Sequence, residues 1–282
     1  MIRSDRVLPC LTAVLCSAIW IAPAAAQPDP DLQNSKVEIS YAEPESQALQ
    51  GVYQRLKNRR VLEEIKSFLA PINLPRKLPI RTKQCNALNA WFSYSEGVTL
   101  CYDYVAKFEE VAPKTPTPDG VTRDRAVTGA VVRVMLHELG HAIFNMRDVP
   151  IFGREEDAAD QIAGFIMVQF GKDLARKLIS GAAYHYVLGA QNRTLSRTEF
   201  SDEHGSDAQR FYNYLCLAYG AEREAFKDYV EKGLLPEARA GNCEREYRQV
   251  QNAFSKTISP FINKDLLKRV QARQWLKEED VR

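Results

Sequence analysis

Two histidines and a glutamate near the middle of the chain have the spacing of a metal-binding helix. His137, Glu138 and His141 form the pattern His-Glu-x-x-His. Residues four apart lie on one face of an α-helix, so both imidazoles can bind one tetrahedral Zn²⁺ ion at about 2.0–2.1 Å. Glu138 is turned by about 100° from His137, and we expect it to reach a water on the metal. The pattern therefore predicts a zinc site at which Glu138 is the general base of a hydrolysis.

The residues around this motif are uncharged. Val134, Met135 and Leu136 precede it, and Ala142 and Ile143 follow it. This part of the helix is therefore expected to be buried almost all round. Burying two histidines and a glutamate without partners would cost several kcal/mol, and a bound metal removes that cost. The alternative is a helix whose histidines lie on a solvated face.

A catalytic zinc site needs a third protein ligand and an open position for water. A second predicted helix begins shortly after the first and carries Glu155, Glu156, Asp157 and Asp160. Glu156 and Asp160 are four apart and share a face. We expect Glu156 to be the third ligand and Asp160 to hold a ligand histidine by its other ring nitrogen. Glu155 is an alternative ligand, and the acidic cluster could instead only complement the dipole of a helix N-terminus.

The first 26 residues have the composition of a secretory signal peptide. Arg3 and Arg6 precede an apolar run over residues 7–22, and Ala24 to Ala26 form a cleavage site after Ala26. No later stretch has the roughly 18 apolar residues of a transmembrane helix. We therefore expect an exported protein, periplasmic or secreted, without stable insertion into a membrane. The near balance of 38 Lys and Arg against 36 Asp and Glu argues against nucleic acid as a partner.

Four cysteines remain after the leader: Cys85, Cys101, Cys216 and Cys243. An even number in an exported chain predicts two disulfides. Proximity along the chain favours Cys85 with Cys101 and Cys216 with Cys243. A four-cysteine zinc site is the alternative, but no Cys-x-x-Cys pair supports it.

The rest of the chain predicts one α+β domain over residues 37–282, after a flexible stretch over residues 27–36. Apolar alternation predicts short strands at residues 37–41 and 80–83, and a hairpin at residues 89–93 and 97–102. Helical periodicity covers residues 47–69, with a break near Asn58, and most of the chain after Thr122.

Together these motifs resemble a bacterial family of exported metallopeptidases without an assigned biological role. The resemblance covers most of the chain after the leader, and Glu156-x-x-Ala159-Asp160 resembles the second signature of the gluzincins. It rests also on four shorter segments: Cys85-Asn86, Asn89-Ala90, Asp202-Glu203-His204 and residues 209–213. The resemblance implies a zincin-like fold, in which a small mixed sheet is followed by a mostly helical part. It also implies that an edge strand pairs with extended substrate, and we expect that strand at residues 89–93 or 97–102.

The resemblance further implies a downstream residue that donates a hydrogen bond to the oxyanion of the reaction. Only His185 and His204 remain as histidines outside the motif. His204 follows two acidic residues and is our candidate for this role. Arg210 and Tyr212 are alternatives.

The sequence thus predicts a zinc metallopeptidase that binds one Zn²⁺ per chain through His137, His141 and Glu156 and hydrolyses a peptide or protein substrate. Two other classes use the same residues. One is a zinc amidase acting on cell-wall peptides, and the other is a non-catalytic binding protein with a vestigial zinc site. Glu138 argues against the second class, because a structural site has no use for a base beside the water.

Overall fold

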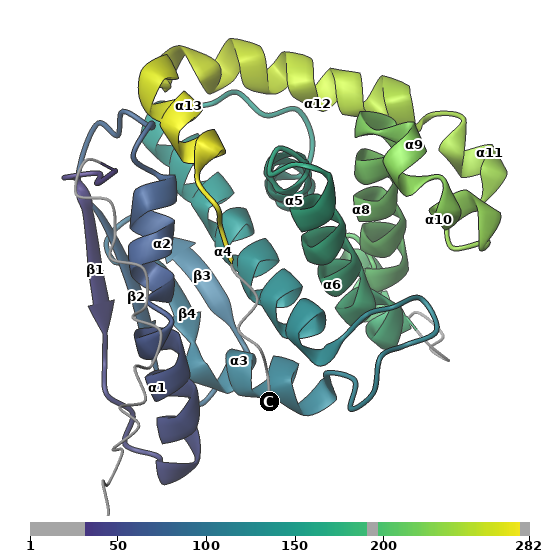
Figure 1. Cartoon of the computed structure of the whole chain (residues 1–282). Coiled ribbons are helices and arrows are strands. Elements are labelled where there is room, and N and C mark those ends of the chain that lie inside the picture. The colour runs from purple at the N-terminus through teal and green to yellow at the C-terminus, as the bar shows by residue number, and fades with distance from the viewer. Residues whose placement is uncertain (1–31, 191–196, 277–282) are drawn as a thin grey trace, which may run out of the picture.

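A small sheet from the N-terminal part of the chain packs beside a larger helical part (Figure 1). The computed structural model describes residues 32–190 and 197–276. This is the predicted α+β architecture. The expected signal peptide and residues 27–31 lie outside the described residues. In the stretch expected to be flexible, Leu32 and Asn34 are buried, and the Asn34 amide donates to the carbonyls of Leu69 and Ile72 at 2.8 Å.

The sheet has four strands in the order β1-β2-β4-β3: β1 (Val37–Tyr41), β2 (Leu78–Lys83), β3 (Ala90–Ser93) and β4 (Gly97–Cys101). The first three in this order are parallel, and β3 runs antiparallel to β4. All five residues of β4 are buried, as a central strand requires. Of the two strands proposed as the edge, β3 occupies it.

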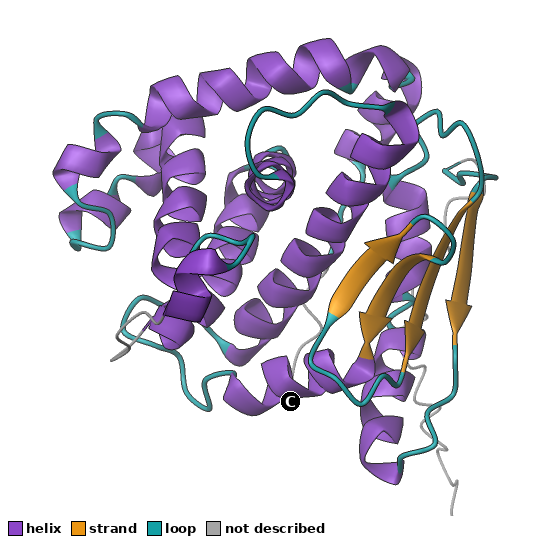
Figure 2. Ribbon diagram, turned by 180° about the vertical axis from the view of Figure 1, so that it is seen from behind, coloured by secondary structure: helices purple, strands orange, loops and turns teal. Residues whose placement is uncertain are grey.

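The open edge of β3 faces the helical part. Cys101 donates its backbone N–H to Asn89 on the paired side. Because pairing alternates along an antiparallel strand, the backbone groups of Ala90 and Phe92 point away from β4. These groups therefore face α4, which packs against β3 (Figure 2).

The predicted helix over residues 47–69 is broken in two, α1 (Gln50–Asn58) and α2 (Val61–Phe68), after a short 3-10 turn η1 (Gln47–Leu49). The break lies at Arg60, whose φ of 54° is left-handed. Helix α3 (Tyr102–Val111) follows β4 directly. A disulfide between Cys85 and Cys101 ties the loop after β2 to the end of β4, as predicted.

Helix α4 (Arg123–Arg147) is the long central helix and carries the His-Glu-x-x-His motif. The hydroxyl of Thr122 caps it by accepting from the N–H of Arg125, and the helix ends at Asp148 with φ 49°. Its buried residues include an almost continuous run from Gly129 to Phe144, which agrees with the predicted burial on all sides.

Helix α6 (Lys172–Ala190) crosses α4 at very short range. A Cβ placed on Gly181 would lie 1.9 Å from the carbonyl oxygen of Arg125, and one on Gly129 would lie 2.7 Å from the backbone of Gly181. Only glycine fits at these two positions, so the contact fixes where α4 lies relative to the helices behind it.

Two helices complete the surroundings of the motif: α5 (Glu155–Val168) and α8 (Asp207–Ala221). Figures 1 and 2 show α5 end-on between α4 and α8, with α12 (Cys243–Thr257) lying across them. The predicted disulfide between Cys216 and Cys243 joins α8 to α12. The other helical segments are α7 (Arg197–Ser201), α9 (Arg223–Phe226), α10 (Asp228–Glu231), α11 (Glu237–Ala240), η2 (Ser259–Phe261) and α13 (Lys264–Ala272). Among the described residues, no helix is both long and apolar enough to cross a bilayer.

Candidate active site

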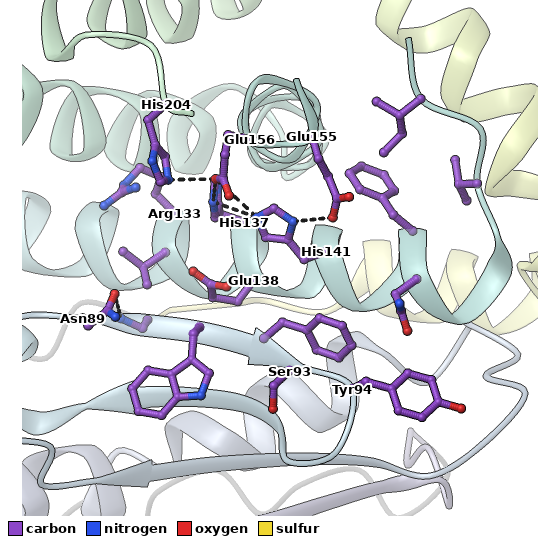
Figure 3. Close-up of a pocket in the computed structure, with 18 of the residues that line it drawn as sticks. Asn89, Ser93, Tyr94, Arg133, His137, Glu138, His141, Glu155, Glu156 and His204 are labelled. Atoms are coloured by element: carbon purple, nitrogen blue, oxygen red, sulfur yellow. Dashed lines mark hydrogen bonds and ion pairs between the residues drawn. The ribbon is translucent and has the colours of Figure 1, made fainter. Parts of the chain in front are cut away.

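The His-Glu-x-x-His segment lines a cleft of about 690 Å³ between α4 and β3 (Figure 3). His137 and Glu138 are only 4% and 8% exposed. The start of α5 brings Glu155 and Glu156 to the same cleft, and the segment before α8 brings His204. The cleft thus collects ionisable groups from three separate stretches of the chain.

Three electron-pair donors converge at the centre of the cleft. Glu156 Oε2 lies 2.9 Å from His137 Nε2 and 3.4 Å from His141 Nε2, and the two nitrogens are 3.2 Å apart. Donor atoms of a tetrahedral zinc ion with bonds of 2.0–2.1 Å are separated by about 3.3 Å. The triangle therefore has the size of three ligands around one metal.

The other nitrogen of each imidazole contacts a carboxylate. His137 Nδ1 lies 2.9 Å from Asp160 Oδ1, and His141 Nδ1 lies 2.7 Å from Glu155 Oε1. An ionised carboxylate only accepts hydrogen bonds, so each Nδ1 carries a proton, and a neutral ring in this orientation directs the lone pair of Nε2 toward the centre. Two such lone pairs and a carboxylate oxygen facing one another repel unless a cation, either a proton or a metal ion, lies between them. The donor set therefore fits a metal ion.

The electrostatics of the cleft favour positive charge at this point. Burial raises the pKa of Glu156, but hydrogen bonds with His137, His141 and His204 outweigh burial and hold it well below its usual range. Burial lowers the pKa of His141, but hydrogen bonds with Glu156 and Glu155 raise it to about 9. Both shifts have the sign expected where a cation binds.

Asp160 links His137 to helix α8. Its carboxylate accepts from Arg210 Nε at 2.6 Å and Nη2 at 2.8 Å, and from Tyr214 Oη at 3.3 Å, besides the contact with His137. Burial raises the pKa of Asp160, yet hydrogen bonds from His137 and Arg210 outweigh burial and lower it. Arg210, considered above for the oxyanion, is instead paired with this carboxylate, although it also lines the cleft.

Glu138 lies on the side of the cleft that faces β3 (Figure 3). Burial raises the pKa of its carboxyl group, and a hydrogen bond from the backbone of Phe92 on the open edge opposes part of that rise. A carboxylate with a raised pKa is a stronger base than one in free solution, and it can take a proton from water near neutral pH. Glu138 is thus placed between the converging donors and the edge strand.

His204 reaches the site from the segment before α8. Its Nε2 lies 2.8 Å from Glu156 Oε2, and its Nδ1 lies 2.9 Å from Asp202 Oδ1. His137, Glu156 and His204 also offer ligand atoms within 4.8 Å of one another. The set that includes His141 is tighter, with no separation above 3.4 Å, so we favour it.

Tyr212, the other alternative for the oxyanion role, and His185, the remaining histidine outside the motif, lie elsewhere. Tyr212 is 37% exposed and does not line the cleft. His185 bonds the carbonyl of Ala126 through Nε2 at 3.1 Å and packs edge-on against Phe108. Both are therefore separated from the converging donors.

Sequence reasoning missed Arg133, which lines the cleft and is 5% exposed. It stands four residues before His137, hence on the same face of α4. A lone charged residue on the metal-facing stripe of an apolar helix was the signal that could have found it.

Residues 41–258 match a protein family described as "Putative metallopeptidase". The chain belongs to this family. The comparisons found no match among curated proteins and none among solved structures. Membership in this metallopeptidase family points to a hydrolase with peptide substrates, and the cluster of histidine and glutamate donors fits its metal cofactor.

Proposed function

We propose that this protein is an exported, zinc-dependent metallopeptidase that binds one Zn²⁺ through His137, His141 and Glu156. The observation that carries the proposal is the convergence of two imidazole Nε2 atoms and one carboxylate oxygen within 3.4 Å of one another. Two imidazoles and one carboxylate are a donor set of catalytic zinc sites, which leave a position open for water or substrate. The leader-like N-terminus and the two disulfides support export, since disulfides persist in oxidising compartments.

Each residue of the cleft has a defined task in this proposal. When bound, zinc lowers the pKa of water toward about 7 and polarises the scissile carbonyl. Glu138 takes the proton of the attacking water and delivers it to the leaving amine. Asp160 and Glu155 hold the rings of His137 and His141 so that Nε2 of each faces the metal.

His204 is the proposed donor to the oxyanion. Its Nδ1 is held by Asp202, so Nε2 is directed at the site rather than free to rotate away. The contact of that nitrogen with Glu156 Oε2 places it beside the ligand atoms, where a developing negative charge on the carbonyl oxygen would accept its hydrogen bond.

The open edge of β3 is the proposed binding surface for the substrate backbone. The outward groups of Ala90 and Phe92 are not used by β4. The N–H of Ala90 donates to Asn89 Oδ1 at 2.9 Å, and the backbone of Phe92 bonds Glu138, so an extended peptide that adds to the sheet there as a further strand would displace these side chains. Such a peptide would lie in the cleft between β3 and α4, with a carbonyl near the donors and Glu138 beside it.

Metal content tests the ligand set. We would measure zinc by elemental analysis in the purified wild type and in four alanine variants, at positions 141, 155, 156 and 204. We expect about one zinc per chain in the wild type and loss of zinc in His141→Ala and Glu156→Ala. Glu155→Ala and His204→Ala should both retain zinc, with a reduced affinity in Glu155→Ala. Zinc retained in Glu156→Ala, or lost in His204→Ala and kept in His141→Ala, would reject the assignment.

Activity tests the role of Glu138. The zinc-loaded wild type should cleave members of a quenched fluorescent peptide library, and Glu138→Gln should lower kcat by at least 100-fold while its zinc content is unchanged. Asp157→Asn, on the exposed side of the first turn of α5, is a matched control that should retain activity. Equal turnover by Glu138→Gln and the wild type would remove Glu138 from the mechanism.

A further inference from the structure

Arg133 is a buried cation in the wall of the cleft. It lies one helical turn before His137, and its Nη1 donates to Tyr186 Oη at 2.9 Å. Its Nε is buried and has no hydrogen-bond partner. Within residues 32–190 and 197–276, no carboxylate forms an ion pair with Arg133. A cation that is 5% exposed and lacks a counter-charge is costly unless something else compensates it.

The described residues around Arg133 include two guanidinium groups but one carboxylate, so one positive charge has no counter-charge. Arg133 and Arg210 both lie over the ring of Tyr186, with their guanidinium carbons 5.0 Å and 4.8 Å from its centroid. The one carboxylate of this cluster, Asp160, is taken by Arg210 in a two-point contact. The aromatic face compensates part of the charge of Arg133, but the acceptors suited to a planar guanidinium fork are those of a carboxylate.

The position of Arg133 along the cleft defines which part of a substrate it can reach. A helical turn advances by about 5.4 Å, which is between one and two residues of an extended peptide at about 3.3 Å each. Figure 3 shows Asn89, at the start of β3, toward the end of the cleft where Arg133 lies, and Tyr94 toward the His141 end. A peptide pairing antiparallel to β3, the more stable arrangement, runs from the Tyr94 end to the Asn89 end. Arg133 then meets residues on the C-terminal side of the scissile bond.

We infer that Arg133 is a specificity-determining residue that binds a carboxylate one or two residues after the scissile bond. The carboxylate is either an acidic side chain or the free C-terminus of a short peptide. The inference rests on the proposed peptidase function, because it assumes that the peptide lies along β3. It adds a substrate class, since peptides that bring a negative charge to this end of the cleft are preferred.

Binding measured without turnover tests this inference. The zinc-loaded Glu138→Gln protein would be titrated with a peptide that has the cleavage sequence of the wild type. The peptide is made in four forms. Two carry Glu and two carry Gln at the first and second positions after the scissile bond, and each of these has either a free or an amidated C-terminus. Where no cleavage sequence is found, a mixture of such peptides of random remaining sequence serves as probe. A charge-assisted contact predicts about 10-fold to 100-fold tighter binding of the form that carries the carboxylate Arg133 recognises.

Two further substitutions in the same background assign the preference to Arg133. Arg133→Met should abolish it, whereas Arg133→Lys, which keeps the charge without the planar fork, should retain a reduced preference. Arg76→Met is the matched control, because Arg76 lies over Tyr94 at the other end of the cleft, 4.1 Å from its ring centroid, and should leave the preference intact. Melting temperature and zinc content would be recorded for every variant.

The outcomes separate the two sources and the two proposals. A Glu over Gln preference identifies an acidic side chain, and a preference for the free over the amidated form identifies the terminal carboxylate. Equal binding of all four peptides overturns the inference, and this result needs no Arg133 variant. A preference that survives Arg133→Met also overturns it. Carboxylate-selective binding by a protein that cleaves no peptide would reject the proposed function and leave the role of Arg133 standing.

Discussion

Replacing Asp160 with asparagine removes one negative charge and no volume from the network behind His137, a proposed zinc ligand. Asp160 is 7% exposed and accepts from Arg210 twice, from His137 and from Tyr214. An asparagine side chain has one accepting oxygen, and its amide group would face a donor of Arg210 or of His137. The variant therefore leaves a buried guanidinium without its counter-charge and loosens the imidazole that is the proposed ligand.

The size of the effect follows from these contacts. Removing one partner of a buried ion pair costs about 3–5 kcal/mol, and the partial access of Arg210 to the cleft favours the lower end, about 3 kcal/mol. For a domain of this size that shift lowers the melting temperature by roughly 6–12 °C. Loss of the partner that orients His137 should weaken zinc binding by about 10-fold to 100-fold.

Two measurements on the same preparations test the reasoning. Thermal unfolding of the metal-free protein reports the lost ion pair and hydrogen bonds without a contribution from the metal, and competition with a chromophoric chelator reports zinc affinity. Asp157→Asn is the control, because Asp157 is 37% exposed and pairs with Arg154 on the surface, where such pairs contribute up to about 1 kcal/mol. An Asp160→Asn protein that melts early but binds zinc like the wild type would refute the orienting role, and one with an unchanged melting temperature would refute the ion-pair estimate.

Three further predictions concern the sheet edge, a buried histidine and a helix crossing. Ala90→Pro should raise KM for peptides several-fold without loss of zinc. Proline is tolerated on the edge of a sheet, but it removes the outward N–H of residue 90. Unchanged steady-state kinetics would exclude this edge as the substrate site. Burial lowers the pKa of His185 to about 4, although its hydrogen bond with Ala126 opposes the shift. The unfolded chain then binds more protons between pH 4 and 6.5, so stability is lost as pH falls through this range. His185→Gln should remove about 2 kcal/mol of the loss between pH 7 and pH 5 in urea unfolding, and an identical pH dependence in both proteins would contradict the shift. Gly181→Ala should destabilise by about 3 kcal/mol, since its Cβ would overlap the Arg125 carbonyl; chemical denaturation at pH 7 checks this, and wild-type stability would show that the helices can separate at no cost.

The local patterns of the sequence predicted much of the fold because they depend on neighbouring residues. Strand alternation identified β1 and the β3–β4 hairpin, and the cap at Thr122 agrees with the predicted start of α4. Proximity along the chain predicted both disulfides correctly. The motif spacing brought His137 and His141 to one face, since a helix fixes that relation by itself.

Contacts between elements that are far apart in the sequence could not be predicted from these local patterns. The sequence left both hairpin strands open as the edge, although the uncharged run of Gly97–Cys101 indicates a central strand. It offered Arg210 for the oxyanion, since nothing along the chain shows that a residue 50 positions away supplies its carboxylate.

The three proposed ligands lie on consecutive helices, and the outermost pair, His137 and Glu156, is separated by only 19 positions. Contacts of such short range carry a small closure entropy and form early in folding, whereas β3, which completes the cleft, is far earlier in the chain. We therefore expect α4 and α5 to be able to capture the metal as a pair before the sheet docks against them. Zinc present during refolding should then act as a nucleating cross-link between two helices, and it would raise the rate of folding as well as the stability of the folded protein.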